Sequence, residues 1–198
     1  IKICGLDKHV ITIDDIVFKI GPRINAAGRM EVDSDDENAA PSGGHSAVYL
    51  MVARDEEVAS EYGAFIDTCN QDRKNIDRSI TQEAHEIIES RPELKNRKST
   101  VIYNPKWMKG IVGIVASRLI ETYYRPTVVL TMSNGYVTGS ARSVPGFDLY
   151  QAVESCADLL ENFGGHIYAA GLTMRPENVE EFTRRFNDYV EEHIDPEM

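Results

Sequence analysis

The sequence lacks long apolar runs, paired cysteines and an excess of basic residues. It contains no run of about 18 apolar residues, the length that crosses a bilayer, so no membrane-spanning helix is predicted. No secretory signal pattern is present either. The three cysteines, Cys4, Cys69 and Cys156, are far apart and odd in number. They match neither a disulfide framework nor a metal-binding spacing, so we expect reduced thiols in a cytoplasmic protein.

The net charge of −11 weighs against a protein that coats nucleic acid non-specifically, because such proteins are basic. The charge is uneven, however. Residues 101–150 contain five basic and two acidic residues, whereas residues 151–198 contain three basic and eleven acidic ones. An acidic surface with one basic region is compatible with an enzyme that admits a polyanion at a single place.

The length of 198 residues allows one domain or two small ones, and the hydrophobic content of 42% supports a packed core. The first residue is Ile1 and not methionine, which suggests a piece of a longer protein.

Residues 1–54 are predicted to hold short helices joined by a polar loop, with Thr12 or Asp14 as the first cap. The expected segments are a helix over Ile13–Ile20, the segment GPRINAAGRM over Gly21–Met30, a mobile acidic loop over Glu31–Gly44, a plain Gly-Gly-His loop over Gly43–His45, and a short apolar helix or strand over Ala47–Ala53.

A long helix is predicted over about Asp55–Ser90. Apolar residues recur there at three- and four-residue spacing, and no proline interrupts the segment until Pro92. The middle, residues 70–75, has no apolar position, which suits a helix that bridges two domains. The alternative is a bundle helix that packs along its whole length.

The remaining residues alternate between strands and helices. The predicted order, β-α-β-β-α-β-α, favours an α/β fold: a long connecting helix, then a mixed β-sheet with helices packed on it. The expected elements are strands over Ser99–Tyr103, Thr127–Met132, Tyr136–Ala141 and Ile167–Met174, and helices over Gly110–Tyr124, Asp148–Glu161 and Glu177–His193.

The segment FGGHIYAAG, Phe163–Gly171, is the first candidate binding motif. Gly164 and Gly165 have no side chain, so their N–H groups can approach an anion, and His166 adds a hydrogen-bond donor directly beside them. The small residues that follow would allow a ligand to approach closely. The alternative interpretation is a glycine turn beside an ordinary histidine.

Two further motifs have the chemistry of phosphate binding. In WMKGIVGIVASRL, a lysine and a glycine begin a helix, where free N–H groups favour anions, and Arg118 lies about two turns later. In GSARS, Ser140 offers a hydroxyl and Arg142 a guanidinium that can bind a phosphate with two parallel bonds. A helix cap and a strand-end turn are the alternatives. Three such motifs in one small domain together favour phosphate binding.

These motifs, in this order and spacing, resemble the RecJ family of single-stranded-DNA-specific 5′→3′ exonucleases, which belong to the DHH phosphoesterases. The resemblance implies a catalytic domain with two metals, a long connecting helix and a substrate-binding domain. Residues 1–54 would then be the end of the catalytic domain, residues 55–92 the interdomain helix, and residues 97–198 the DHH-associated substrate-binding domain.

The sequence departs from that family in two respects. It has no Asp-His-His motif, and its histidines do not cluster with aspartates: His9, His45, His85, His166 and His193. The divalent metal, Mn or Mg, would therefore belong to the catalytic half, with no metal ligand in this chain. Met108 stands where many members have histidine, and we do not expect the C-terminal β-barrel of many relatives within this chain.

The resemblance also implies roles for individual residues. Ser140 and Arg142 would hold a phosphate at or near the 5′ end. Gly164, Gly165 and His166 would bind the scissile phosphate and stabilise the charge of the transition state. The remaining expected contacts are Arg23, Asn25 and Arg29 along the passage between domains, and Arg118 on the nucleic-acid backbone.

The implied function is the substrate-binding part of an exonuclease of DNA repair and recombination that acts on single-stranded DNA and binds no membrane. Contacts to phosphate carry no base sequence, so single strands would be selected by the width of the gap and by base stacking. Three alternatives stay open: an oligoribonuclease or cyclic-dinucleotide phosphodiesterase, a non-catalytic module like that of alanyl-tRNA synthetases, and a nucleotide-binding α/β domain.

Overall fold

The computed structural model describes residues 1–6, 10–30 and 43–195. It divides the chain into an N-terminal unit, Ile1–Ile76, and a C-terminal unit, Asp77–Met198, which we describe separately. The division falls inside helix α4 (Glu56–Glu89), which begins where the carboxylate of Asp55 accepts bonds from two backbone N–H groups. The predicted long helix is thus confirmed. No helix in the described ranges is long and apolar enough to cross a membrane.

The N-terminal unit is helical. Thr12 begins its first helix as a capping box with Asp15, and the helical path continues through a π-helical stretch into the GPRINAAGRM segment. Pro22 stands in the first turn of that last helix, where a missing N–H costs least. The elements of the N-terminal unit are η1 (Lys2–Cys4), α1 (Ile13–Asp15), η2 (Ile16–Ile20), α2 (Gly21–Arg29), α3 (Gly43–Val52) and the beginning of α4.

The second Gly-Gly-His, Gly43–His45, is not the loop that the sequence predicted; it forms the first turn of α3. A Cβ on Gly43 would lie 2.2 Å from the carbonyl oxygen of Ala27, so glycine is what lets α3 approach α2. Ala27 and Ile66 belong to the small core of this unit. The acidic loop expected over residues 31–44 lies almost wholly outside the described residues.

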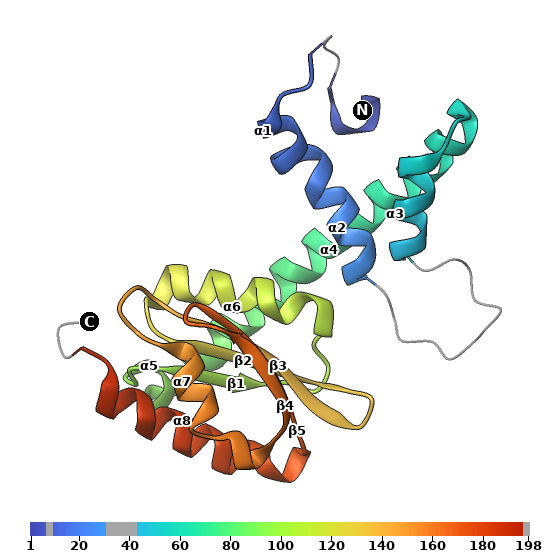
Figure 1. The fold of residues 1–198 in the computed structure, drawn as a ribbon. Helices are drawn as coiled ribbons and strands as arrows, with labels where there is room; N and C mark the ends of the chain where they lie inside the picture. The colour runs from blue at the N-terminus through green and yellow to red at the C-terminus, as the bar shows by residue number, and fades with distance from the viewer. Residues whose placement is uncertain (7–9, 31–42, 196–198) are drawn as a thin grey trace. The chain divides into compact units, whose positions relative to one another are not determined.

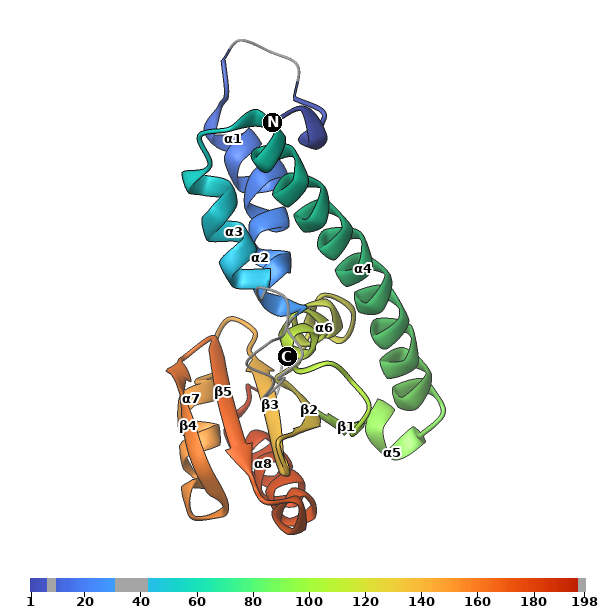
Figure 2. The same cartoon turned by 90° about the vertical axis from the view of Figure 1, so that its right-hand side faces the viewer.

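The C-terminal unit is built on a mixed β-sheet, as predicted, and the sheet has five strands (Figures 1 and 2). The strand order is β1-β2-β3-β5-β4; β1 and β2 are parallel, and every other neighbouring pair is antiparallel. The strands are β1 (Thr100–Tyr103), β2 (Thr127–Ser133), β3 (Tyr136–Arg142), β4 (Leu160–His166) and β5 (Ala169–Met174).

Helices cover both faces of this sheet (Figure 1). Helix α6 packs on β2 and β3 on one face, and α7 and α8 lie on the other. The end of α4 contacts the segment that leads into α6. There the indole N–H of Trp107 donates a 2.9 Å hydrogen bond to the carboxylate of Glu83 on α4. The helical elements are α5 (Pro92–Lys95), α6 (Lys109–Tyr123), α7 (Leu149–Glu154), η3 (Ala157–Leu159), η4 (Pro176–Asn178) and α8 (Val179–His193).

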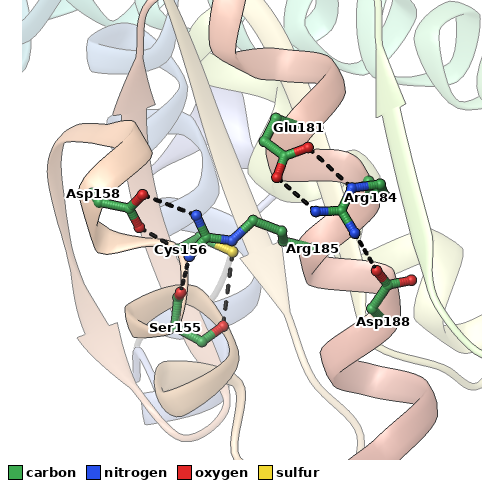
Figure 3. Close-up of polar contacts among 7 residues, drawn as sticks. All are labelled: Ser155, Cys156, Asp158, Glu181, Arg184, Arg185 and Asp188. Carbon is green, nitrogen blue, oxygen red and sulfur yellow. Dashed lines mark hydrogen bonds and ion pairs between the residues drawn. The ribbon is translucent and has the colours of Figure 1, made fainter.

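Helix α8 combines an apolar face with a charged one. Phe182 and Phe186 are fully buried against the sheet and stack at 5.8 Å. On the outer side, Figure 3 shows Arg184 between Glu181 and Asp188, at 2.7 and 2.8 Å. The neighbouring Arg185 binds Asp158 and the carbonyl of Ser155, which ties α8 to the segment that leads into β4.

One predicted element of the C-terminal unit is wrong. The helix expected over Asp148–Glu161 ends at Glu154, and residues 160–166 form strand β4 rather than a helix end and a turn. The order of elements after α4 and α5 is therefore β-α-β-β-α-β-β-α, one strand more than predicted. The Gly-Gly-His motif consequently lies within an edge strand of the sheet and not in a loop.

Candidate functional site

Strands β3, β5 and β4 carry a regular array of polar and small residues on one face of the sheet. Directly paired residues of an antiparallel sheet point to the same face, and so do residues two positions apart along a strand. We call this array the open face. Its three rows, read from β3 through β5 to β4, are Arg142–Ala169–His166, Ser140–Gly171–Gly164 and Thr138–Thr173–Asn162.

The opposite face of the same strands is apolar. Val137, Ala141, Leu172 and Met174 alternate with the open-face residues and are buried in the core under α7 and α8. Helix α6 covers β2 and β3, yet the open face remains accessible on the other two strands, where Gly171, Gly164 and His166 are exposed. A hollow of about 300 Å³ lies there, lined by Thr138, Thr173, Asn162 and the neighbouring residues.

The two glycines of the Gly-Gly-His motif serve different purposes. Gly165 has φ +153°, and a Cβ on it would lie 2.2 Å from the carbonyl oxygen of Ala169, so the β4–β5 hairpin requires glycine there. A Cβ on Gly164 would meet nothing within 4 Å, and one on Gly171 beside it would meet only an oxygen at 4.0 Å. Packing therefore does not explain Gly164 and Gly171, which leave bare backbone at the centre of the open face.

His166 is held by its own hairpin. The backbone N–H of Tyr168 donates to His166 Nδ1 at 3.2 Å, so Nδ1 is an acceptor and the proton of the neutral ring is on Nε2. The ring is exposed. The imidazole thus presents an N–H donor beside the bare backbone of Gly164 and Gly165, which is the arrangement expected for contact with an anionic oxygen.

Ser140 and Arg142 lie together on β3, under helix α6. Arg142 Nη1 donates to Ser140 Oγ and to the carbonyl of Ala141, both at 2.8 Å. A Cβ on Gly113 of α6 would lie 3.0 Å from Ser140 Oγ and 3.1 Å from Arg142 Nη2. Gly139, in contrast, is a packing glycine, since its Cβ would lie 2.4 Å from Leu130 Cδ2.

Arg118 lies apart from the open face. Its Nε and Nη2 bind the two carboxylate oxygens of Asp77 on α4 at 2.9 and 2.8 Å, and the Asp77 side chain is only 1% exposed. The hydrogen bond with Asp77 raises the pKa of the Arg118 guanidinium. This arginine therefore ties α4 to α6, and its expected contact with a nucleic-acid backbone stays a prediction.

Three expected site residues belong to α2 of the N-terminal unit. Arg23 binds Asp67 at 2.7 Å and the carbonyl of Lys19 at 2.8 Å, so it has a structural role within this unit. Asn25 and Arg29 are exposed and lie one turn apart on the same side of the helix. Their expected position along a passage between domains stays a prediction.

The basic stretch of residues 101–150 is less available to a ligand than its charge count implied. Arg125 is only 7% exposed, and burial lowers the pKa of its guanidinium. It bonds to Thr100 and to the backbone carbonyls of Leu94, Lys95 and Arg97, and so anchors the segment before β1. Two of the five cations in the stretch, Arg118 and Arg125, therefore hold the fold together.

A metal site is absent from the described residues, in which no three histidine, cysteine, aspartate or glutamate side chains come together. The donor set of the described residues thus does not fit a divalent cation.

Sequence reasoning missed four residues of this site. Thr138, Thr173 and Asn162 form the third row of the open face, and Gly113 makes room for Ser140 and Arg142. Asn162 carried no signal, because β4 was not predicted. Thr138 and Thr173 could have been found by counting in steps of two from Ser140 and Gly171.

Comparison with known proteins shows which family this domain belongs to. Residues 96–192 match the DHHA1 domain family. The chain is 35% identical over 199 residues to the single-stranded-DNA-specific exonuclease RecJ of Bacillus subtilis and 32% identical over 208 residues to that of Salmonella typhimurium. These matches include all of this chain but only 24% and 34% of those proteins. The crystal structure of Thermus thermophilus RecJ with Mg²⁺ matches with a TM-score of 0.77 and 28% identity, over 92% of this chain and 26% of that one.

The five-stranded unit with its open face is thus a DHHA1 domain. The similarity to RecJ also includes the N-terminal unit, and the chain belongs to the RecJ family. It spans a quarter to a third of the length of the RecJ proteins that it matches.

Proposed function

We propose that this chain is the substrate-binding part of a metal-dependent exonuclease that degrades single-stranded DNA from the 5′ end, in DNA repair and recombination. The observation that carries the proposal is the open face. Its central glycines have no packing reason, and it has an arginine on β3 and a histidine N–H donor on β4.

The two sides of the open face would bind different phosphates. Arg142, with Ser140 beside it, would bind a phosphate at or near the 5′ end, because a guanidinium can donate two parallel bonds to it. The backbone of Gly164 and Gly165 and the Nε2–H of His166 would bind the scissile phosphate. Donors fixed in place before the reaction stabilise charge that develops in the transition state.

The metal would come from outside these residues. Thermus thermophilus RecJ has been solved with Mg²⁺ and with Mn²⁺. The described residues of this chain bring together no set of ligands for either ion. We therefore expect the 198-residue chain alone to release no mononucleotides from 5′-phosphorylated single-stranded DNA in the presence of manganese.

The similarity to RecJ over the whole chain favours this function over the alternatives that the sequence left open. The alternatives are expected to share the DHHA1 domain with this chain, whereas the RecJ relatives match the N-terminal unit as well.

The sharpest test is a pair of neighbouring alanine substitutions in the full-length protein. Gly164→Ala adds a methyl group that meets no protein atom within 4 Å, so the thermal midpoint should stay unchanged. The methyl group would occupy the position proposed for the phosphate, and kcat/KM on single-stranded DNA should fall at least tenfold. Gly165→Ala is the matched control, because its methyl group would clash with Ala169 and should lower the melting temperature.

Replacing the two proposed phosphate donors separates their roles. Arg142→Ala should raise KM and reduce the preference for a 5′-phosphate, because its contact exists before and during the reaction. His166→Ala should mainly lower kcat, by about 10²–10³-fold, as when a transition-state donor is lost. Normal kinetics per folded molecule in Gly164→Ala, Arg142→Ala and His166→Ala would refute the proposed function.

A further inference from the structure

The tip of the β4–β5 hairpin presents an aromatic side chain on a fixed backbone. Ile167 and Tyr168 connect the two strands, and their side chains are 45% and 50% exposed. Their carbonyl oxygens accept hydrogen bonds from the backbone N–H groups of Leu149 at 3.2 Å and Ser143 at 2.9 Å. The N–H of Tyr168 is bound to His166. The tip is thus held by three bonds, although its side chains face solvent.

The Tyr168 ring lies directly beside the proposed phosphate donor. The ring centroids of Tyr168 and His166 are 6.3 Å apart and their planes cross at 72°, an edge-on arrangement. The described residues bring no other aromatic ring against Tyr168. Tyr150 and Phe163, by comparison, contact one another at 6.0 Å and are half-buried. Packing therefore does not account for an aromatic residue at position 168.

We propose that Tyr168 is a stacking platform for a nucleobase, that of a nucleotide next to the phosphate bound by His166. This inference rests on the proposed function and adds a contact to the base. The separation of the two rings is comparable with the distance between the base and the phosphate of one nucleotide. One nucleotide can therefore reach both side chains.

A stacking contact suits an enzyme that binds single strands without sequence preference. Every base has a π-face, so an aromatic platform accepts all four bases, while a paired base in a duplex is already stacked and not available. The rigid backbone of the hairpin tip lowers the entropy lost on binding, since little remains to be ordered. Tyr168 would thus contribute to the choice of single strands over duplexes.

The test measures binding of the full-length protein to a 5′-phosphorylated oligothymidylate without turnover, in the presence of EDTA. Loss of a base–aromatic stack weakens binding by about tenfold or more. Tyr168→Leu should show that loss, whereas Tyr168→Phe should bind like the wild type. Tyr124→Leu is the matched control, because Tyr124 is a 57% exposed tyrosine at the end of α6 and should be silent.

A double-mutant cycle makes the assignment specific. Three oligonucleotides are compared, each with a single abasic site, at the first, second or third nucleotide. At one of these positions, removal of the base should weaken binding to the wild type but not to Tyr168→Leu. An oligonucleotide with 5-iodo-deoxyuridine at that position should crosslink to Tyr168, as located by mass spectrometry. Equal abasic penalties in the two proteins at every position would overturn the proposal, as would equal weakening by Tyr168→Phe and Tyr168→Leu.

The two proposals fail in different ways. If Gly164→Ala and Arg142→Ala weaken binding and Tyr168→Leu does not, the open face binds phosphate and only the stacking inference is wrong. If none of these three substitutions changes the affinity, the proposed function itself is wrong.

Discussion

Replacing Arg118 should destabilise the C-terminal unit rather than weaken DNA binding. Arg118 on α6 holds the carboxylate of Asp77 with two bonds, and Asp77 is 1% exposed. Arg118→Ala would remove the two bonds that this buried carboxylate accepts from the guanidinium. Removing one partner of a buried ion pair costs about 3–5 kcal/mol. Because the Arg118 side chain is 47% exposed, water can reach the pair, and we expect a loss of about 2–3 kcal/mol of unfolding free energy.

The loss is large enough to measure by thermal or urea denaturation. For a chain of this size, about 2–3 kcal/mol corresponds to a fall of roughly 5–10 °C in the melting temperature. Arg118→Lys keeps the charge but cannot form two parallel bonds, so it should recover only part of the loss. The double variant Asp77→Leu with Arg118→Leu removes the buried carboxylate together with the guanidinium, and its stability should exceed that of Arg118→Ala.

The competing prediction for Arg118 is the contact with the nucleic-acid backbone that the family resemblance implied. The affinity for single-stranded DNA of each folded variant, measured by fluorescence anisotropy well below its melting temperature, separates the two. An Arg118→Ala protein that melts like the wild type but binds DNA several-fold more weakly would refute the structural interpretation.

Three further predictions concern packing and charge. Gly43→Ala would put a methyl group 2.2 Å from a carbonyl oxygen of α2, so the N-terminal unit should lose about 1–3 kcal/mol in urea denaturation; an unchanged midpoint would contradict the packing. Gly113→Ala would put a methyl group 3.0 Å from Ser140 Oγ, so the affinity for single-stranded DNA should fall several-fold while the melting temperature falls less than in Gly43→Ala. A large fall in melting temperature with unchanged DNA affinity would show that Gly113 serves packing and not the site. The hydrogen bond from Arg184 lowers the pKa of Glu181 below its ordinary 4.5, so its stabilisation is present above that pH and is lost as the pH falls through the lowered pKa. Glu181→Gln should therefore reduce the acid sensitivity of the urea midpoint, and equal sensitivity would refute this pairing.

The elements with strong local signals could be predicted from the sequence. The long helix has apolar residues at helical spacing and Asp55 as its cap. The β2–β3 hairpin turns at Asn134 and Gly135, which have φ values of +51° and +78°, the conformation that these two residue types adopt most easily. In both cases residues close together in sequence determine the structure.

The β4–β5 hairpin had no such signal. Its connection is Ile167–Tyr168, without the glycine or asparagine that marks a two-residue turn, and neither residue has a positive φ. Strand β4 contains Glu161, Asn162 and two glycines, which are poor strand formers. Pairing with β5 and the core contacts of Phe163 hold it in the sheet, so only the tertiary structure identifies it.

The candidate site was predictable in kind but not in detail. The motifs indicated anion binding by Ser140, Arg142 and the Gly-Gly-His segment, and the structure puts these residues on one face of one sheet. The partner of Arg118 was not predictable, because Asp77 lies 41 residues away in the sequence. A charge count cannot distinguish an arginine that holds a helix from one that faces a ligand.

The hydrogen bond from the Tyr168 N–H to His166 Nδ1 has a consequence for the orientation of the imidazole. With Nδ1 occupied as an acceptor, the neutral ring carries its proton on Nε2. A flipped ring would bring a C–H to the Tyr168 N–H and lose this bond. The hairpin thus selects one tautomer and one ring orientation of its own histidine. The donor proposed to meet a phosphate oxygen is therefore set before substrate arrives, and its alignment adds no cost during the reaction.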